Sequence, residues 1–224
     1  EGFASGGGIY LYSVDFNFNN IIVSDNVLNP LRTAQGGGIH IDASSDGIIL
    51  NSIIENNTLL IGDLTSQYYT GAGISSWNSN LIIDNCIIQD NESPSSAGIR
   101  GGGGRISIFN TLFYNNIGTA WYTINCHGTE LTMSNSVVHN DEFVWSMIGS
   151  WHNSKINLIN TTITDINGYY TFEFDITTMP NNGYDFYVEE LQQAGYYAFN
   201  GQTEFHITGL GQNGSESVTV DFIN

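Results

Sequence analysis

The chain has 224 residues, with 22 acidic residues against four basic ones and a formal net charge of −18. Four Lys and Arg residues cannot replace the counterions around nucleic-acid phosphates, and they cannot attract an anionic membrane surface, so both partners are excluded. A hydrophobic fraction of 41% favours a folded core over disorder, and no apolar run is long enough for membrane insertion.

A glycine-rich motif that ends in isoleucine recurs through the first half of the chain. It reads Gly-Gly-Gly-Ile at Gly6–Ile9 and Gly36–Ile39, Gly-Ala-Gly-Ile at Gly71–Ile74, and Ala-Gly-Ile at Ala97–Ile99. Glycine permits a tight corner and a close approach between neighbouring backbones. We therefore expect a glycine-rich strand to open most repeats.

An asparagine followed by a small residue and two mostly apolar residues recurs after each motif. Successive asparagines are 31, 34, 25, 25 and 25 residues apart, which predicts stacked coils with loops inserted at the rim. The six asparagines are Asn20, Asn51, Asn85, Asn110, Asn135 and Asn160.

Apolar residues alternate with polar ones before each of these asparagines. Leu81 and Ile83 stand four and two positions before Asn85, and the pattern recurs in the next three coils. This period of two predicts a strand with one buried face, and the same count places the asparagines on the inward side. We therefore predict a structural ladder of inward amides that stack from coil to coil.

The repeats predict an all-β protein, a parallel β-helix with about six coils of three short strands over residues 1–168. After residue 168 the period stops, and alternation over residues 170–176 and 184–188 predicts a small antiparallel, sandwich-like β-domain over residues 169–224. This domain would cap the solenoid. The alternative is a continuation of the solenoid in degenerate coils.

The coils resemble those of a known group of proteins. The Gly-Gly-Gly-Ile openings, with a following Phe-x-x-Asn at Phe16–Asn19 and Phe113–Asn116, resemble the repeats of polymorphic outer-membrane proteins. More broadly, residues 6–168 are similar to the right-handed β-helix repeats of the pectate-lyase-like superfamily. The resemblance implies a right-handed β-helix, and it leaves function open because the superfamily includes adhesins, autotransporter passengers, lyases and hydrolases.

The 25-residue frame aligns further side chains. Arg105, Glu130 and Lys155 fall in one structural charge column of base, acid and base, which we interpret as an ion-pair ladder. The frame also stacks His127 on His152, a pair for which no third metal ligand appears, and Cys126 on Trp151. Cys86 lies two coils from Cys126, too far for a disulfide, so we expect two free thiols.

Aromatic residues give the main functional indication. Trp121 and Trp145 are 24 residues apart, and Tyr10 and His40 project from the glycine-rich strand if Ile9 and Ile39 are buried. Arg100 points outward from the same strand region. We predict that Tyr10, His40, Arg100, Trp121 and Trp145 form a face that binds glycans. The alternative is that the rings fill the core or pack under the rim loops.

No complete catalytic set is present. A lyase resembling pectate lyases needs a cationic base and Ca²⁺ held by clustered carboxylates, and the residue constellation of polygalacturonase-like hydrolases is not met. We therefore assign no catalytic residue and lean against an enzyme. Asp42 with Asp46, and Asp90 with Glu92, offer oxygens for Ca²⁺, but no established calcium-loop spacing occurs. We expect no cofactor, with Ca²⁺ as the single candidate.

The sequence thus favours a non-catalytic β-helix protein, secreted or at the cell surface, in adhesion, matrix binding or glycan binding. Its partners would be an extracellular glycan, a protein surface or copies of itself. The alternatives are a polysaccharide-active enzyme or sugar-binding module acting on a neutral polymer, with carboxylates as acid and base, and a self-assembling structural spacer.

Overall fold

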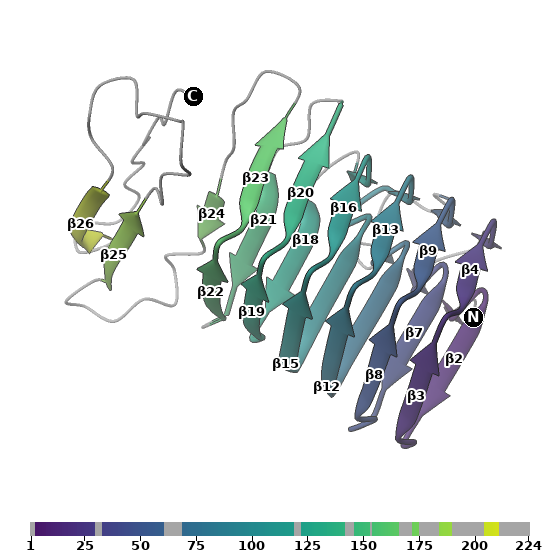
Figure 1. The fold of residues 1–224 in the computed structure, drawn as a ribbon. Coiled ribbons are helices and arrows are strands. Elements are labelled where there is room, and N and C mark those ends of the chain that lie inside the picture. Colours follow the sequence, from purple (N-terminus) through teal and green to yellow (C-terminus); the bar gives the residue numbers. More distant parts are fainter. Residues whose placement is uncertain are drawn as a thin grey trace.

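The structure is a computed structural model, and it describes residues 3–29, 33–60, 69–118, 122–141, 146–152, 154–165, 172–174, 184–189 and 204–210. The only regular secondary structure among these residues is the β-strand, and most of the strands are parallel (Figure 1). Among them, no helix has the length and apolar character needed to cross a membrane.

Within the described residues the strands form five sheets, of eleven, six, four, three and two strands. The first half contributes β1 (Phe3–Ser5), β2 (Ile9–Tyr12), β3 (Phe16–Asn19), β4 (Ile22–Ser24), β5 (Val27–Leu28), β6 (Thr33–Gln35), β7 (Ile39–Asp42), β8 (Gly47–Leu50), β9 (Ile53–Glu55), β10 (Thr58–Leu59), β11 (Tyr69–Thr70), β12 (Ile74–Asp84), β13 (Ile87–Gln89) and β14 (Glu92–Ser93). The second half contributes β15 (Ile99–Phe109), β16 (Leu112–Tyr114), β17 (Ile117–Gly118), β18 (Tyr122–His127), β19 (Glu130–Ser134), β20 (Val137–Asn140), β21 (Ser146–Trp151), β22 (Lys155–Ile159), β23 (Thr162–Asp165), β24 (Phe172–Phe174), β25 (Tyr184–Glu189) and β26 (Glu204–Leu210).

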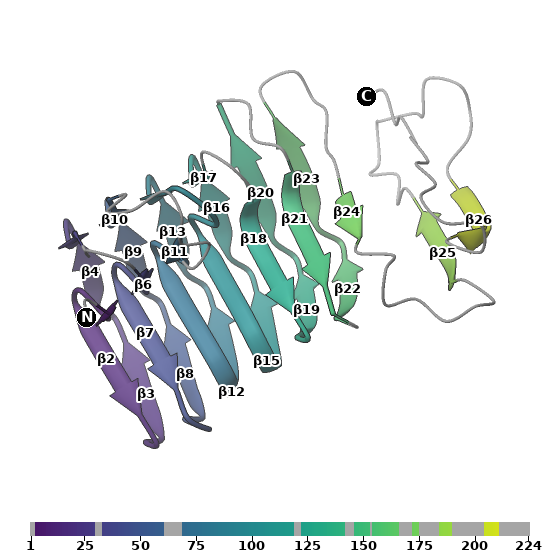
Figure 2. The ribbon, with the colours of Figure 1, turned by 180° about the vertical axis from the view of Figure 1, so that it is seen from behind.

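The largest sheet has the order β2-β7-β12-β15-β18-β21-β24, and the long strands β12 and β15 join this row to a second row formed by β3, β8, β19 and β22. A six-stranded sheet runs β23-β20-β16-β13-β9-β4, a four-stranded sheet runs β17-β14-β10-β5, and the three-stranded one runs β1-β6-β11. Figure 2 shows the same stack from behind. Parallel sheets in a stacked arrangement are compatible with a β-helix-like fold.

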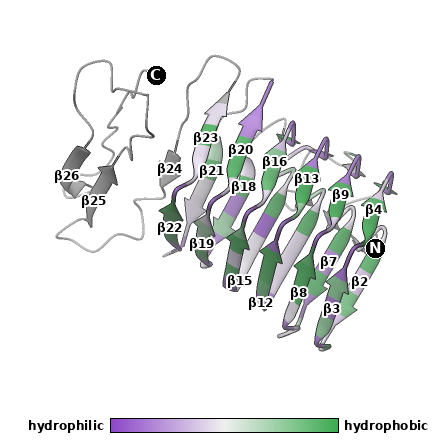
Figure 3. Cartoon of the chain, in the orientation of Figure 1, coloured by the Kyte–Doolittle hydropathy of each residue, from purple (hydrophilic) through white to green (hydrophobic). Residues whose placement is uncertain are grey.

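Neighbouring parallel strands pair in the register that the 25-residue repeat predicts. Leu81 pairs with Ile106 and Ile106 with Leu131, so each alternating apolar position lies over its counterpart. These side chains are at most 1% exposed, and Ile83, Ile108 and Met133 are fully buried beside them. The predicted buried face is therefore confirmed, and Figure 3 shows hydrophobic residues recurring from strand to strand.

The six predicted ladder asparagines occupy corners, and the prediction that they point inward is wrong. Each has a positive φ between 46° and 60° and an exposed side chain. Asparagine adopts this left-handed conformation more readily than most residues, and a left-handed residue ends the strand. The alternation of inward and outward side chains therefore cannot be counted past the corner residue. Some of the amides still pair along the outside, as Asn85 does with Asn51 and Asn160 with Asn135.

The residue after each corner asparagine is the one that points inward. Ser52, Cys86, Thr111 and Ser136 are at most 2% exposed. The Thr111 hydroxyl donates to the carbonyl oxygen of Phe109 at 2.7 Å and accepts the Cys86 N–H of the preceding coil at 3.3 Å. A small polar residue here satisfies backbone groups that the corner would leave buried and unpaired.

A second series of asparagines forms the internal chain of amides. Asn57, Asn91 and Asn116 are fully buried, and Asn26 and Asn140 extend the series at either end. Asn57 donates through Nδ2 to Oδ1 of Asn91 at 3.0 Å, and Asn91 donates in the same way to Asn116 at 2.8 Å. Each amide also reaches backbone, as when Asn91 Nδ2 donates to the Ile54 carbonyl at 3.0 Å.

The glycine-rich motif makes room for these buried amides. A Cβ added to Gly8 would lie 2.8 Å from Nδ2 of Asn26, and one added to Gly38 would lie 2.9 Å from Nδ2 of Asn57. The same Cβ on Gly38 would also lie 2.8 Å from the Gly73 carbonyl oxygen of the next coil. The motif thus combines two close approaches, one to the neighbouring backbone and one to an internal asparagine.

The charge column is aligned, and one ion pair is recorded within it. Arg105 pairs in register with Glu130, and Glu130 with Lys155. The Arg105 guanidinium donates to Glu130 Oε2 at 3.0 Å, and both side chains are about half exposed. Such an exposed pair contributes little to stability.

Parallel pairing continues past residue 168. Strand β24 pairs with β21, with Phe172 opposite Ile148, so the large sheet extends to residue 174. Strands β25 and β26 form an antiparallel pair. The remainder of the predicted C-terminal domain lies outside the described residues.

We predict that the two asparagine series differ sharply in their contribution to stability. Asn116→Ala removes an amide that bridges two coils and leaves buried partners unpaired, so it should lower the free energy of unfolding by about 1–3 kcal/mol. Asn110→Gly, the matched corner change, keeps the left-handed conformation and should stay within about 0.5 kcal/mol. Denaturant titration measures both, and equal losses would contradict this assignment.

Both cysteines are free, as predicted, and both are buried. Burial raises the pKa of the Cys126 thiol to about 12. The reactive thiolate is therefore almost absent in the folded protein at neutral pH. We predict that iodoacetamide labels Cys126 only after unfolding, as peptide mass spectrometry would show. Rapid labelling under native conditions would contradict the buried position.

Candidate functional site

The outer face of the large sheet brings three of the predicted site residues into one file. Tyr10 on β2 pairs with His40 on β7, His40 with Ser75 on β12, Ser75 with Arg100 on β15, and Arg100 with Asn125 on β18. The neighbouring positions on these strands, which include Ile39, Ile74 and Ile99, point into the core. Alternation therefore places the file on the opposite, outer side. We call these five residues the polar file.

The polar file is enclosed along most of its length. Tyr10 is 51% exposed, whereas His40 is 2%, Ser75 0%, Arg100 7% and Asn125 9% exposed. The expectation that this face lies open to solvent holds only at its β2 end. Within the described part of the chain, His40 Nδ1, Ser75 Oγ and Asn125 Oδ1 are buried without a hydrogen-bond partner. Buried polar atoms without partners are uncommon and costly.

A second file runs beside the first, two positions further along each strand. We call it the aromatic file, and its residues are Tyr12, Asp42, Trp77, Gly102, His127 and Trp151. Tyr12 is 62% exposed, and Trp77, His127 and Trp151 are partly exposed. This face therefore presents partly exposed rings next to enclosed polar groups.

Two contacts fix the Trp77 ring. A Cβ added to Gly102 would lie 2.5 Å from the indole, so only glycine leaves space for the ring on the next strand. The Arg100 guanidinium lies over the same ring, 4.6 Å from its centroid, in a cation–π contact. At the β2 end, the Tyr10 and His40 rings stack with centroids 5.4 Å apart.

The other two predicted residues, Trp121 and Trp145, lie outside the described residues. The repeat in this region is 24 residues long and not 25, because Cys126 pairs with Ser150 and His127 with Trp151. The predicted stacking of Cys126 on Trp151 is therefore wrong by one residue. His127 and His152 nevertheless lie close, with ring centroids 4.1 Å apart.

Burial governs the protonation of His40. Removal from water lowers the pKa of His40, and the negative charge of Asp42 opposes this effect in part. The imidazole is consequently neutral at pH 7, with one nitrogen that donates and one that accepts. The polar file thus contains neutral groups that can donate hydrogen bonds and neutral groups that can accept them.

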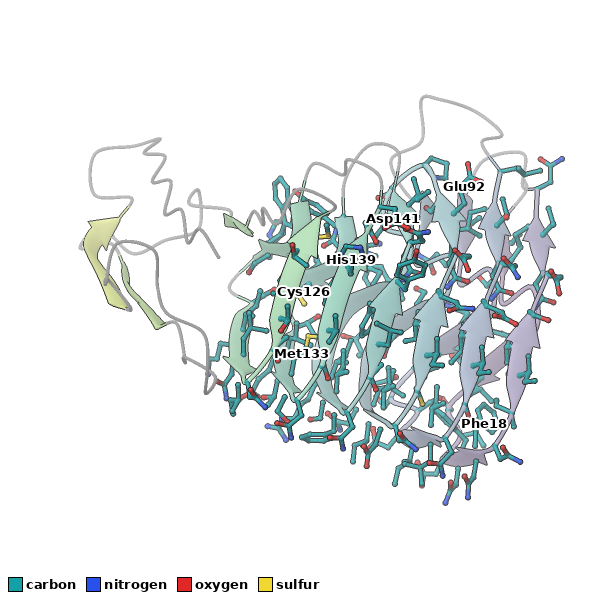
Figure 4. All side chains as sticks on the ribbon, turned by 45° about the horizontal axis from the view of Figure 1, so that its top comes forward. Phe18, Glu92, Cys126, Met133, His139 and Asp141 are labelled. Atoms are coloured by element: carbon teal, nitrogen blue, oxygen red, sulfur yellow. The ribbon has the colours of Figure 1, made fainter. Side chains whose placement is uncertain are left out.

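A separate polar cluster lies on the outer face of the six-stranded sheet. His139 and Asp141 lie close together in Figure 4, with His139 Nε2 3.0 Å from Asp141 Oδ1. The Tyr114 hydroxyl donates to the other carboxylate oxygen, and Asn115 Nδ2 lies 3.4 Å from it. The hydrogen bond from Tyr114, followed by that from His139, lowers the pKa of Asp141. Sequence reasoning did not find this cluster, in which the in-register pair Tyr114 and His139 meets Asp141 just after β20.

Two of the four carboxylates considered as Ca²⁺ ligands cap backbone groups. Asp42 Oδ1 accepts the Ala43 N–H at 2.7 Å, and Asp46 Oδ1 accepts the Asn80 N–H at 3.0 Å. Across the described strands and loops, no three His, Cys, Asp or Glu side chains are grouped to hold a metal ion.

No family model, no curated protein and no solved structure matches this chain.

We predict that His40 makes stability depend on pH. The unfolded histidine has a pKa of about 6.5 and the folded one a lower value, so the unfolded chain binds the proton more readily. The contribution of neutral His40 is complete above about pH 6.5 and is lost as the pH falls toward the lowered folded pKa. Denaturant titrations across this range should show a smaller loss for His40→Gln than for wild type. An identical pH profile would contradict the prediction.

Proposed function

We propose that residues 3–174 form a right-handed parallel β-helix of the pectate-lyase-like type, with the internal amide series at one of its corners. Parallel pairing of each strand with the equivalent strand of the next coil supports this proposal. The recurring corner residues with positive φ support it as well. The proposal extends to a small antiparallel domain that contains β25 and β26.

We further propose that this β-helix is a non-catalytic protein, secreted or at the cell surface, that binds glycans in adhesion or matrix attachment. The observation that carries this function is the aromatic file, with Tyr12 exposed and Trp77 and Trp151 partly exposed on one face of the large sheet. Aromatic rings offer large apolar surface at low conformational cost, and they pack against the C–H faces of sugars. Repeating coils extend that surface along the stack.

The chemistry of this face supports binding rather than cleavage. Over β2–β21, Asp42 is the one carboxylate that the polar and aromatic files contain among the described residues. Glycoside hydrolysis ordinarily uses a pair of carboxylic side chains. Asp42 also accepts a backbone hydrogen bond, so over β2–β21 the two files hold no second carboxylate that could pair with it as acid and base.

One observation favours polysaccharide hydrolysis as a second candidate function. Burial, followed by the charge of Glu55, raises the pKa of Asp90, whereas its neighbour Asp141 has a lowered pKa. Asn115 interacts with both carboxylates. Carboxyl groups with pKa values that diverge in this way are typical of acid and base pairs.

Trp77→Ala should lower the affinity for a bound glycan by about tenfold, since it removes the ring that Arg100 and Gly102 hold in place. Ile82→Ala, an exposed apolar change on the same strand, is the matched control and should have little effect. A glycan array identifies the ligand and calorimetry measures its affinity. Tyr12→Ala, at an exposed position, provides a second variant that should lower affinity without a change in folding.

A reducing-end assay separates the two candidate functions. We expect no release of reducing ends from any glycan that binds. Release that disappears in Asp90→Asn would replace the binding function with hydrolysis. Silence on the array and in calorimetry would overturn glycan binding.

A further inference from the structure

A row of apolar side chains runs along the outer face of the six-stranded sheet. In β4, β9, β13, β16 and β20, the second residue of each strand belongs to the core and is at most 6% exposed. Alternation therefore turns the first residue of each strand outward. These first residues pair in register from strand to strand, and we call them the apolar stripe: Ile22, Ile53, Ile87, Leu112 and Val137.

The apolar stripe is accessible to solvent. Ile22 is 67% exposed and Val137 is 38% exposed, and the three members between them are partly exposed. A contiguous row of exposed apolar side chains is typical of a surface that a partner covers. Strands β9, β13, β16 and β20 each lie between two paired strands. A partner would therefore dock on the side chains of this face, because it could not add a strand there.

Three carboxylates border the apolar stripe. Glu55 stands two positions after Ile53 on β9 and accepts a hydrogen bond from Gln89 Nε2 on the neighbouring strand at 2.7 Å. Asp90 directly follows β13, and Asp141 directly follows β20. Burial, followed by the charge of Glu55, raises the pKa of Asp90, and the charge of Asp141 adds to this effect. We call Glu55, Asp90 and Asp141 the acidic border.

The charge of this face selects the kind of partner. The six strands β4, β9, β13, β16, β20 and β23 contain no Lys or Arg, and the whole chain has a net charge of −18. A second copy of the chain would bring like charge to the acidic border, and so would its own residues 169–224, which have eight acidic residues and no Lys or Arg. A complementary partner is apolar at its centre and cationic at its rim.

The shape of the apolar stripe fits a helix. Strands β4, β9, β13 and β16 are three residues long, so the face is narrow across and extends along the stack (Figure 1). The stripe spans four strand spacings, or about 19 Å. About 13 residues of α-helix cover that length. Apolar residues at i, i+3, i+4 and i+7 form a stripe of similar width on such a helix.

We infer that the apolar stripe docks a cationic amphipathic helix of a partner protein, with the apolar face of the helix on the stripe and its Lys and Arg side chains at the acidic border. The stripe and the aromatic file lie on different sheets. The inference is therefore independent of the proposed glycan-binding function.

Fluorescence anisotropy with the full chain and a labelled 14-residue peptide of leucine and lysine tests the inference. The leucines follow helical spacing and form one apolar face. A scrambled peptide keeps the composition and charge without that face, and a third peptide has glutamate in place of each lysine. The cationic amphipathic peptide should bind at least about tenfold more tightly than either of the others, and circular dichroism should show that it gains helix on binding.

Ile87→Lys distinguishes the apolar stripe from the overall charge of the chain. It places a cation against the helix and should weaken binding at least about tenfold. Ile48→Lys is the matched control, since it makes the same change at a partly exposed outward isoleucine on β8, and its affinity should stay within about threefold of wild type. Val137→Lys, at a position that is 38% exposed, provides a second stripe variant that disturbs packing less.

Glu55→Gln tests the acidic border. It should lower affinity about threefold and reduce the loss of affinity on added salt, because one charge pair with the helix is removed. Asp15→Asn, at an exposed position just before β3, makes the same charge change away from the border and should preserve both values. Equal salt dependence in Glu55→Gln and wild type would overturn the role of the border.

Other results would overturn the inference as a whole. Equal binding of the scrambled peptide would show attraction by charge alone, and wild-type affinity in Ile87→Lys and Val137→Lys would place the helix elsewhere. Absence of binding by all three peptides would exclude a cationic helix. Self-association in sedimentation velocity that Ile87→Lys abolishes would make a second copy the occupant. None of these results bears on the glycan array, which tests the proposed function separately.

Discussion

The hydrogen-bonded register between neighbouring parallel strands is the constraint on which the other features depend. Parallel backbone pairing fixes each residue above its counterpart, so any side chain that recurs in the sequence becomes a column in space. The apolar positions become a continuous core, and the residues after the corners become an internal series of hydroxyl and thiol groups. The same constraint aligns Tyr10, His40, Ser75, Arg100 and Asn125, which lie far apart in the sequence.

Stacking also creates a requirement that each corner must meet. A corner buries backbone N–H and carbonyl groups that the strands do not pair, and burial without a partner is costly. Asparagine meets the requirement where Asn57, Asn91 and Asn116 reach both the neighbouring amide and a backbone carbonyl. Glycines such as Gly38 and Gly73 leave space for these amides. The glycine-rich motif and the internal asparagines are therefore two parts of one packing solution.

Much of the strand arrangement could be predicted from the sequence, because alternation and a 25-residue period report directly on pairing. Which asparagines point inward could not be predicted, because the alternation of inward and outward side chains breaks at a left-handed residue such as Asn110. The sequence does carry the signal for the correct series, an apolar residue three positions before the asparagine, as in Phe113-x-x-Asn116. The alternation of buried and outward positions in their strands correctly placed Tyr10, His40 and Arg100 on one face. Ser75 and Asn125 were missed because their place in the polar file follows from register and burial, which composition does not reveal.

The side-chain hydrogen bonds between the internal asparagines all run in the same direction along the chain. Asn26, Asn57 and Asn91 each donate through Nδ2 to Oδ1 of the next amide along the chain, so their dipoles point the same way and polarise one another. This series of like-oriented amides ends at Asn116, whose Nδ2 donates to the carbonyl oxygens of Ile88 and Tyr114. Losses at two adjacent members should consequently not add, because the first replacement already weakens the bond that the second would remove.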